Sequence, residues 1–133
     1  MVAKRPDVDL SRVARESRGR FSERVAAMFL VAHGYRVLAR RLKTPYGEID
    51  IVAKRGRRIV FVEVKYRLTM AAAQDALRRQ QARRVARAAA HWMKRYPAYG
   101  DFEQGFDAVL VVPWRWPVLV RDAYQPIGTS GRM

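Results

Sequence analysis

Two β-branched runs on either side of a glycine constrain the fold of this chain more than any other feature. The runs "EIDIVAK" and "RIVFVEVK" occupy residues 48–54 and 58–65, and Gly56 lies between them. Apolar residues that alternate with polar ones around a short glycine-containing turn are typical of an antiparallel β-hairpin. The sequence therefore predicts that the two runs pair with each other inside a sheet.

Acidic residues interrupt the apolar pattern of this hairpin. Side chains alternate between the two faces of a strand, so Glu48 and Asp50 share one face of the first run, and Glu63 and Lys65 share one face of the second. If the loop spans residues 55–58, the numbers of paired residues sum to 113. This register places Asp50 opposite Glu63 and Glu48 opposite Lys65, with the Cβ atoms of each pair roughly 4.5–5.5 Å apart.

Two opposed carboxylates among apolar side chains destabilise a sheet unless a cation lies between them. Mg²⁺, or Mn²⁺ in its place, is the natural cation, because it prefers carboxylate and phosphate oxygens. On this hypothesis Asp50 and Glu63 hold the metal, Lys65 steadies an attacking water or a developing phosphate charge, and Glu48 is a candidate auxiliary residue. The alternative is a solvated sheet face on which Lys65 forms ion pairs with Glu48 and Glu63, but this leaves two acids competing for one lysine.

The chain carries a large excess of positive charge. It contains 27 Lys and Arg residues against 12 Asp and Glu residues, which gives a formal net charge of +15. A field of this sign attracts nucleic acid, anionic membrane surfaces or acidic proteins. Most of the cations are arginines, which bind phosphate groups through two parallel hydrogen bonds. The arginines predicted to contact nucleic acid, of which the first four are expected to flank the acidic pair, are Arg55, Arg57, Arg58, Arg67, Arg83 and Arg87.

Several classes of site are excluded or disfavoured. There are no cysteines, which rules out disulfides, thiolate metal sites and cysteine nucleophiles, and which fits a reducing cytoplasm. No apolar run approaches the length of a membrane span, and no apolar segment follows the basic N-terminus. Neither a membrane partner nor a signal peptide is therefore expected.

The pattern along the chain indicates one folded domain. Residues 1–19 are polar and rich in arginine and are predicted to form a flexible basic arm, residues 20–124 form the domain, and residues 125–133 form a disordered tail. The predicted elements are a helix at 20–35, strands at 35–43, 48–54 and 58–65, a long helix at 73–95, and strands at 105–113 and 116–124. This order predicts an α/β fold with a mixed central sheet and helices packed on it.

Two tryptophans stand out near the C-terminus. Trp114 and Trp116 alternate with Arg115 in "PWRWP". They are interpreted as residues of a hairpin turn whose rings cover the end of the sheet. Stacking on unpaired nucleic-acid bases is the alternative interpretation.

The hairpin sequence "GEIDIVAKRGRRIVFVEVKYR", residues 47–67, resembles the signature of the bacterial YraN family. The resemblance continues through "SERVAAMFLVAHGYRVLARRLKTPYGEID" before it and through "ARRVARAAAHWM", "FDAVLVV" and "VRDAY" after it, and it covers nearly the whole predicted domain. The YraN family is in turn similar to the PD-(D/E)xK nucleases, especially the archaeal Holliday-junction resolvases. The chain departs from the name of that superfamily at Ile49, which stands where the Pro-Asp pair has its proline.

The resemblance implies a restriction-endonuclease-like core, α-β-β-β-α-β, in which helices flank a central mixed sheet. It implies that Asp50 and Glu63 bind Mg²⁺ and that Lys65, two residues after the glutamate, assists hydrolysis. Resolvases carry a glutamate on the first helix, which corresponds to Glu23; from the residues alone, a first-turn acid favoured by the helix dipole explains Glu23 equally well. Related nucleases act as homodimers and place a Gln or Lys near the site on the helix that contains Gln81. From the residues alone, Gln81 is interpreted as a core residue bonded to backbone.

Three classes of function agree with these features. The leading hypothesis is a Mg²⁺-dependent phosphodiesterase that acts on DNA, including branched structures. The second is a non-catalytic nucleic-acid-binding module that keeps the fold and the charge. The third is an interaction protein whose basic helix binds an acidic partner or a membrane surface. Positive charge is common to all three, and only the acidic pair separates the first from the others.

Overall fold

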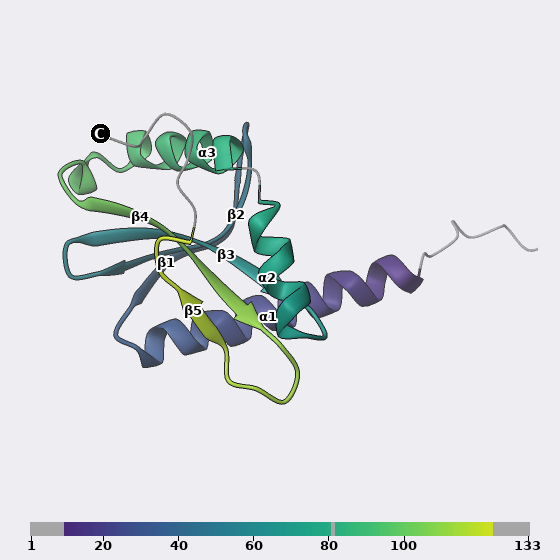
Figure 1. Cartoon of the computed structure of the whole chain (residues 1–133). Helices are drawn as coiled ribbons and strands as arrows, with labels where there is room; N and C mark the ends of the chain where they lie inside the picture. Colours follow the sequence, from purple (N-terminus) through teal and green to yellow (C-terminus); the bar gives the residue numbers. More distant parts are fainter. Residues whose placement is uncertain (1–9, 81, 124–133) are drawn as a thin grey trace, which may run out of the picture.

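A five-stranded mixed sheet with helices on both faces forms the centre of the protein (Figure 1). The structure, a computed structural model, describes residues 10–80 and 82–123. The elements are α1 (Leu10–Ala32), β1 (Arg36–Thr44), β2 (Gly47–Arg55), β3 (Arg58–Tyr66), α2 (Met70–Arg78), α3 (Ala82–Arg95), the 3-10 helix η1 (Pro97–Tyr99), β4 (Glu103–Val111) and β5 (Val118–Val120). The predicted α/β class and mixed sheet are confirmed, and the element order is compatible with a restriction-endonuclease-like core.

The strands lie in the order β1-β2-β3-β4-β5, and only β3 and β4 run parallel. A parallel pair needs a long crossover, which α2 and α3 supply. The β2–β3 hairpin has the predicted register, because its pairs run from Arg55↔Arg58 to Ile51↔Val62. Gly56 opens the two-residue turn with a φ of +59°, a conformation that glycine adopts without strain.

Each face of the sheet has its own helical cover (Figure 1). Ala26 and Leu30 of α1 pack on one face, against a cluster that includes Val60 and Val62. On the other face, Trp92 of α3 meets the ring of Phe61 edge-on, with 5.9 Å between ring centroids. The apolar alternation of β3 therefore divides its side chains between α1 and α3, as a strand buried on both faces requires.

The predicted long helix at 73–95 is wrong, because the structure contains two shorter helices, α2 and α3. Leu77 of α2 packs near Leu110 of β4, whereas Trp92 of α3 packs over β2 and β3. One straight helix cannot reach both regions of a twisted sheet, so the chain turns after Arg78. Neither Gly nor Pro marks this turn in the sequence. Gln81, the predicted auxiliary residue, lies outside the described residues.

The first helix also differs from the prediction. It begins at Leu10 rather than near residue 20, and its first turns project beyond the sheet (Figure 1). Residues 10–19, which were predicted to belong to a flexible arm, are therefore helical. Residues 1–9 and the predicted tail at 125–133 lie outside the described residues. Within the described ranges, no helix combines the length and the apolar composition that a membrane crossing requires.

A buried ion pair ties the hairpin turn to β4. The guanidinium of Arg58 donates two hydrogen bonds of 3.0 Å to the fully buried carboxylate of Asp107. The same guanidinium donates to Asp122, whose backbone N–H donates in turn to Asp107 at 2.9 Å. The hydrogen bonds that Arg58 donates to Asp107 raise the pKa of Arg58 above its ordinary value. Arg58 therefore has a structural role, and its donors are engaged by Asp107 and Asp122. Its contact with nucleic acid stays a prediction.

Candidate metal and nucleic-acid site

Strands β2 and β3 separate at Asp50. Their pairing stops at Ile51↔Val62, and the next free backbone donor, the N–H of Val64, donates to Asp50 Oδ2 at 2.8 Å. On the other side of β2, the pairing with β1 skips Asp50, opposite which Arg41 adopts a φ of +51°. The carboxylate of Asp50 therefore lies in the gap between two strands rather than on a face of the sheet.

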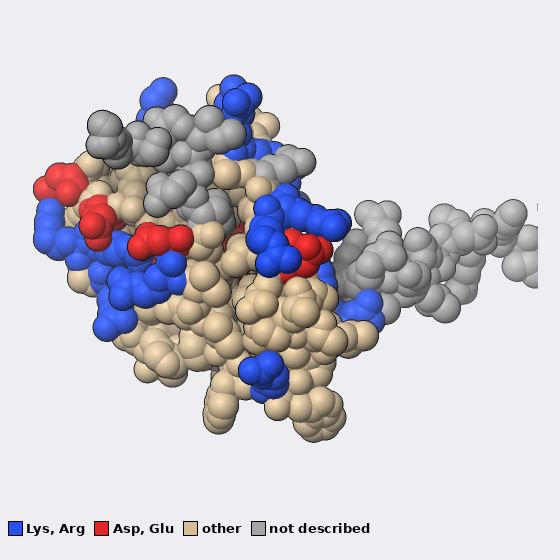
Figure 2. Space-filling model, in the orientation of Figure 1, with Lys and Arg blue, Asp and Glu red and all other residues tan. Residues whose placement is uncertain are grey.

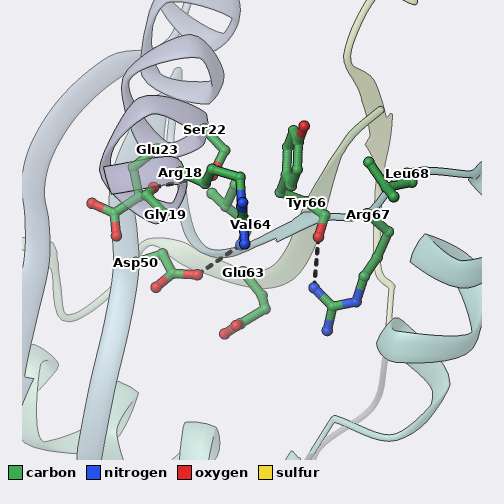
Figure 3. A pocket seen from close by; sticks show the side chains of 10 residues that line it. All are labelled: Arg18, Gly19, Ser22, Glu23, Asp50, Glu63, Val64, Tyr66, Arg67 and Leu68. Carbon is green, nitrogen blue, oxygen red and sulfur yellow. Dashed lines mark hydrogen bonds between the residues drawn. The ribbon is translucent and has the colours of Figure 1, made fainter. Parts of the chain in front are cut away.

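This gap opens into a cavity of about 620 Å³ between the first helix and the end of β3 (Figure 3). Glu23 of α1, Asp50 of β2 and Glu63 of β3 line the cavity, and their carboxylates lie around the same space (Figure 3). Arg18 and Arg67 line it too. Glu23, Asp50 and Glu63, which the sequence selected together, thus meet in one place.

The group of three acids that could hold a metal ion does not coincide with the predicted pair. Glu23, Glu48 and Asp50 each offer a carboxylate oxygen, and these oxygens lie within 4.8 Å of one another. The predicted partner of Asp50, Glu63, lines the same cavity but is not a member of this group. Glu48, predicted only as an auxiliary residue, is therefore better placed than expected, because it shares a strand with Asp50 two residues away.

Electrostatics at the cavity favour a bound cation. Burial, and next the negative charge of Glu63, raise the pKa of Asp50 to about 8, although the hydrogen bond from Val64 opposes this change. Burial also raises the pKa of Glu23, against the opposing charge of Arg41. Glu23 Oε1 is buried and accepts no hydrogen bond among the described residues; Arg41 Nε approaches it only to 3.7 Å. A hard divalent cation fits this donor set, because it would neutralise the carboxylates and satisfy the free oxygen.

Lys65 forms the ion pair that the alternative interpretation expected with Glu63. The distance from Lys65 Nζ to Glu63 Oε2 is 3.3 Å, and both side chains are largely shielded from solvent. Lys65 does not line the acidic cavity; it borders a separate hollow beside Asp75 and Arg79. Among the described residues it forms no ion pair with Glu48. Glu63 thus lies between the acidic cavity and Lys65.

The predicted arginines divide between the two ends of the hairpin. Arg67 lines the acidic cavity as expected. Arg55 and Arg57 lie at the turn, five or more residues along the strand from Asp50, which corresponds to roughly 16 Å. Arg57 pairs with Asp101 at 2.7 Å. The prediction that the turn arginines flank the acidic pair is therefore wrong, and at the left of Figure 2 acidic residues accompany the cations of this region.

A second hollow, of about 730 Å³, carries the other predicted arginines. Arg83 and Arg87 of α3 line it with Arg84 and with Tyr46 of the turn between β1 and β2. None of these three arginines forms an ion pair with a described residue. The stem of Arg84 lies against Gly47, the first residue of β2, where a Cβ would be 2.9 Å from Arg84 Nε. Arg84 was missed in the sequence, although its place between two selected arginines was a usable signal.

The basic hollow and the acidic cavity lie at the same end of β2. Arg84 contacts Gly47, and the next residue, Glu48, belongs to the acidic group. The site therefore consists of an acidic centre with arginines on either side of the strand that carries it. The fold and this site define a class of protein: an α/β protein whose central sheet opens around an acidic cavity within a basic surface.

Comparison with known proteins identifies the family. Residues 22–111 match a family model described as "Uncharacterised protein family UPF0102", which covers more than half of the chain. The chain belongs to the UPF0102 family, and the resemblance to YraN proteins is confirmed.

Several relatives of high similarity carry the name UPF0102 protein. The protein of Parvibaculum lavamentivorans is 52% identical over 105 residues, which is 79% of each chain. The protein of Mesorhizobium japonicum is 44% identical over 123 residues, or 92% of this chain and 97% of the relative. The protein of Nitrobacter winogradskyi is 49% identical over 106 residues, or 80% of this chain and 90% of the relative.

Proposed function

We propose that this protein binds nucleic acid and that its acidic cavity is a Mg²⁺-dependent site for phosphodiester hydrolysis, with DNA, including branched DNA, as the substrate. One observation carries the proposal: Glu23, Glu48 and Asp50 bring carboxylate oxygens within 4.8 Å of one another at one end of β2. Such a group is unfavourable without a cation, because the burial of Glu23 and Asp50 and the repulsion among the carboxylates disfavour the charged forms. Structural ion pairs do not account for the group, because Lys65 contacts Glu63 instead and Arg41 approaches only Glu23, at 3.7 Å.

Four acids would hold the metal: Glu23, Glu48 and Asp50, together with Glu63, which lines the same cavity. When bound, Mg²⁺ supplies charge neutralisation and polarisation of a phosphoryl oxygen. Lys65 holds the carboxylate of Glu63 in place through its contact of 3.3 Å.

Arginines around the acidic centre would position the phosphate backbone. Arg67 and Arg18 line the acidic cavity, and the hollow with Arg84 lies beyond Gly47 on the other side of β2. Guanidinium groups bind phosphates through parallel hydrogen bonds, and such contacts carry no base information. Binding that rests on these residues is independent of sequence and sensitive to salt.

A non-catalytic nucleic-acid-binding module is the second candidate, and the Lys65–Glu63 ion pair favours it. An ammonium group at 3.3 Å neutralises part of the negative charge that a metal would otherwise neutralise. This candidate predicts binding that Asp50→Asn leaves intact and no cleavage with any divalent cation.

The experiment that tests hydrolysis incubates the protein with duplex, single-stranded and four-way-junction DNA in Mg²⁺ or Mn²⁺. We expect Asp50→Asn and Glu63→Gln each to reduce cleavage by about a hundredfold or more, because each removes a charged oxygen from the metal site. Asp101→Asn is the matched control, since Asp101 is an exposed acid at the far end of the hairpin. Cleavage that survives in both site variants would come from a contaminant and would end the enzyme proposal.

The basic hollow leads to a separate expectation about binding. Replacing Arg83, Arg84 and Arg87 with alanine should weaken binding to any DNA sequence and reduce the slope of log affinity against log salt by roughly 0.9 for each phosphate that the variant no longer neutralises. Titrations of labelled duplex at several salt concentrations measure this slope. Arg95→Ala serves as the control, because Arg95 ends the same helix and lies away from the hollow. An unchanged slope in the triple variant would show that DNA does not contact this surface.

A further inference from the structure

The loop between β4 and β5 holds a tryptophan in a backbone conformation that favours glycine. The N–H of Arg115 donates to the carbonyl of Val112 at 3.3 Å, so Pro113 and Trp114 are the central residues of a turn. Trp114 has a φ of +64°. A turn with proline second and a positive φ third is normally completed by glycine, and bulky residues rarely adopt this conformation.

Both tryptophans of this loop face solvent. The exposed fraction is 103% for Trp114 and 87% for Trp116, whereas Trp92 in the core is 3% exposed. The interpretation that their rings cover the end of the sheet is therefore wrong. Two large rings that bury so little surface add little stability to the folded chain, and exposed apolar surface of this kind marks an interaction site.

The loop leaves the sheet beside the acidic cavity. Strands β3 and β4 run parallel and pair Tyr66 with Val111, and the N–H of Arg67 donates to the carbonyl of Val111 at 3.2 Å. Tyr66 and Arg67 both line the acidic cavity. The loop begins directly after Val111 and extends past the end of β4 (Figure 1). The two rings thus project from the same end of the sheet as the acidic site.

We infer that Trp114 and Trp116 form a stacking platform for unpaired bases of a nucleic acid whose backbone reaches the acidic cavity. The inference rests on the proposed function and narrows its substrate to nucleic acid with a single-stranded segment, such as a frayed end, a flap or a branch point. Bases stack on exposed aromatic side chains without regard to sequence, because every base has a π-face. Arg115, between the two rings, supplies the cation for the adjoining phosphate.

Two prolines restrict the backbone of the loop, which suits it to this role. Pro113 and Pro117 enclose the three residues and restrict their backbone, so less conformational freedom is lost when a ligand binds. Duplex DNA presents its bases already stacked on one another, whereas unpaired bases offer free faces.

Intrinsic fluorescence tests the platform, because the chain has only three tryptophans and the third is buried. Measurements in EDTA prevent hydrolysis. We expect a single-stranded oligodeoxythymidine to quench the emission of the exposed rings. The double variant Trp114→Ala/Trp116→Ala should lose this quenching and bind the strand about tenfold more weakly or worse, while its affinity for a duplex of the same length changes less than about twofold.

A phenylalanine variant and lipid vesicles serve as controls for base stacking. Trp114→Phe/Trp116→Phe should keep most of the affinity for the single strand, since the phenyl rings still stack; loss of affinity there would contradict stacking. Equal loss of strand and duplex binding in the alanine variant, or no loss of strand binding, would overturn the inference alone. A blue shift with phosphatidylglycerol vesicles but no quenching by the strand would assign the loop to a lipid surface and also overturn it. A protein that bound neither strand nor duplex would contradict the proposed function as well.

Discussion

Replacing Arg58 with alanine is expected to lower the free energy of unfolding by about 3–5 kcal/mol. The change removes both hydrogen bonds of 3.0 Å from the carboxylate of Asp107, which has no exposed surface. Removing the cation from a buried carboxylate lowers the free energy of unfolding by far more than the net contribution of the ion pair. The reason is that the desolvation of the carboxylate is then no longer compensated. Urea denaturation at neutral pH measures the loss of unfolding free energy. An unchanged m-value would show that the variant and the native protein expose the same amount of surface on unfolding.

Arg57→Ala is the matched control for this prediction. Arg57 lies next to Arg58 and also contacts an aspartate, Asp101, at 2.7 Å. Both of these side chains are mainly exposed, at 67% and 77%, so water screens the pair and its loss should change stability by less than about 1 kcal/mol. Similar losses in the two alanine variants would mean that burial does not set the strength of the Arg58–Asp107 pair.

Gly105 provides a second, independent probe of the same ion pair. The three atoms nearest to a Cβ built at Gly105 all belong to the Arg58 guanidinium, which such a Cβ would displace. Gly105→Ala should therefore destabilise the native protein by about 2 kcal/mol and cost much less when Arg58 is already alanine. A double-mutant cycle measures this coupling. Additive effects would show that Gly105 is required for another reason.

The hairpin could be predicted from the sequence because its determinants are local. Alternating β-branched residues around Gly56 set the register, and five observed pairs agree with it. The separation of the strands at Asp50 could not be predicted from that alternation. It depends on the left-handed backbone of Arg41 in a neighbouring strand and on the capture of the Val64 N–H by a side chain. Both are tertiary features that the alternation of residues does not encode.

The proximity of Glu23 and Asp50 is another tertiary feature that local sequence patterns do not encode. The structure brings both residues to one cavity, but from the sequence Glu23 could be placed near Asp50 only through the resemblance to nucleases, because 26 residues and a strand separate them in the chain. The position of Arg58 was missed although a signal existed. Asp107 is the only charge inside the apolar run "FDAVLVV", and a charge in a buried strand requires a partner. That pattern predicts a buried cation nearby without saying which of the arginines supplies it.

In the absence of divalent cations, Asp50→Asn is expected to stabilise the protein at alkaline pH and to leave its stability nearly unchanged at acidic pH. Burial and the charge of Glu63 raise the pKa of Asp50 from an ordinary 3.8 to about 8. The folded protein therefore holds this proton to a higher pH than the unfolded chain does. The stability that comes from this group is complete below about pH 4 and is lost as the pH rises towards 8.

Asparagine stays neutral over this whole range, and its oxygen can still accept the hydrogen bond from Val64. We expect the difference in unfolding free energy to grow from near zero at about pH 4 to about 2 kcal/mol in favour of the variant at about pH 9. Urea denaturation in EDTA at a series of pH values measures it. Asp101→Asn, at an exposed position, should stay within about 0.5 kcal/mol of the native protein throughout. A difference that does not depend on pH would contradict the raised pKa of Asp50.

In Mg²⁺ the native protein should be more stable than Asp50→Asn, which is the reverse of their order in EDTA. A cation held by Glu23, Glu48 and Asp50 stabilises the folded state by about 2.7 kcal/mol when its concentration is 100 times its dissociation constant. Asp50→Asn replaces one charged ligand with a neutral amide and should lose most of this gain. If Mg²⁺ stabilised both proteins equally, it would bind elsewhere and the acidic cavity would not be a metal site. Because this measurement detects binding rather than turnover, a protein that binds Mg²⁺ through Asp50 and cleaves no DNA would be a nucleic-acid-binding module with a structural cation.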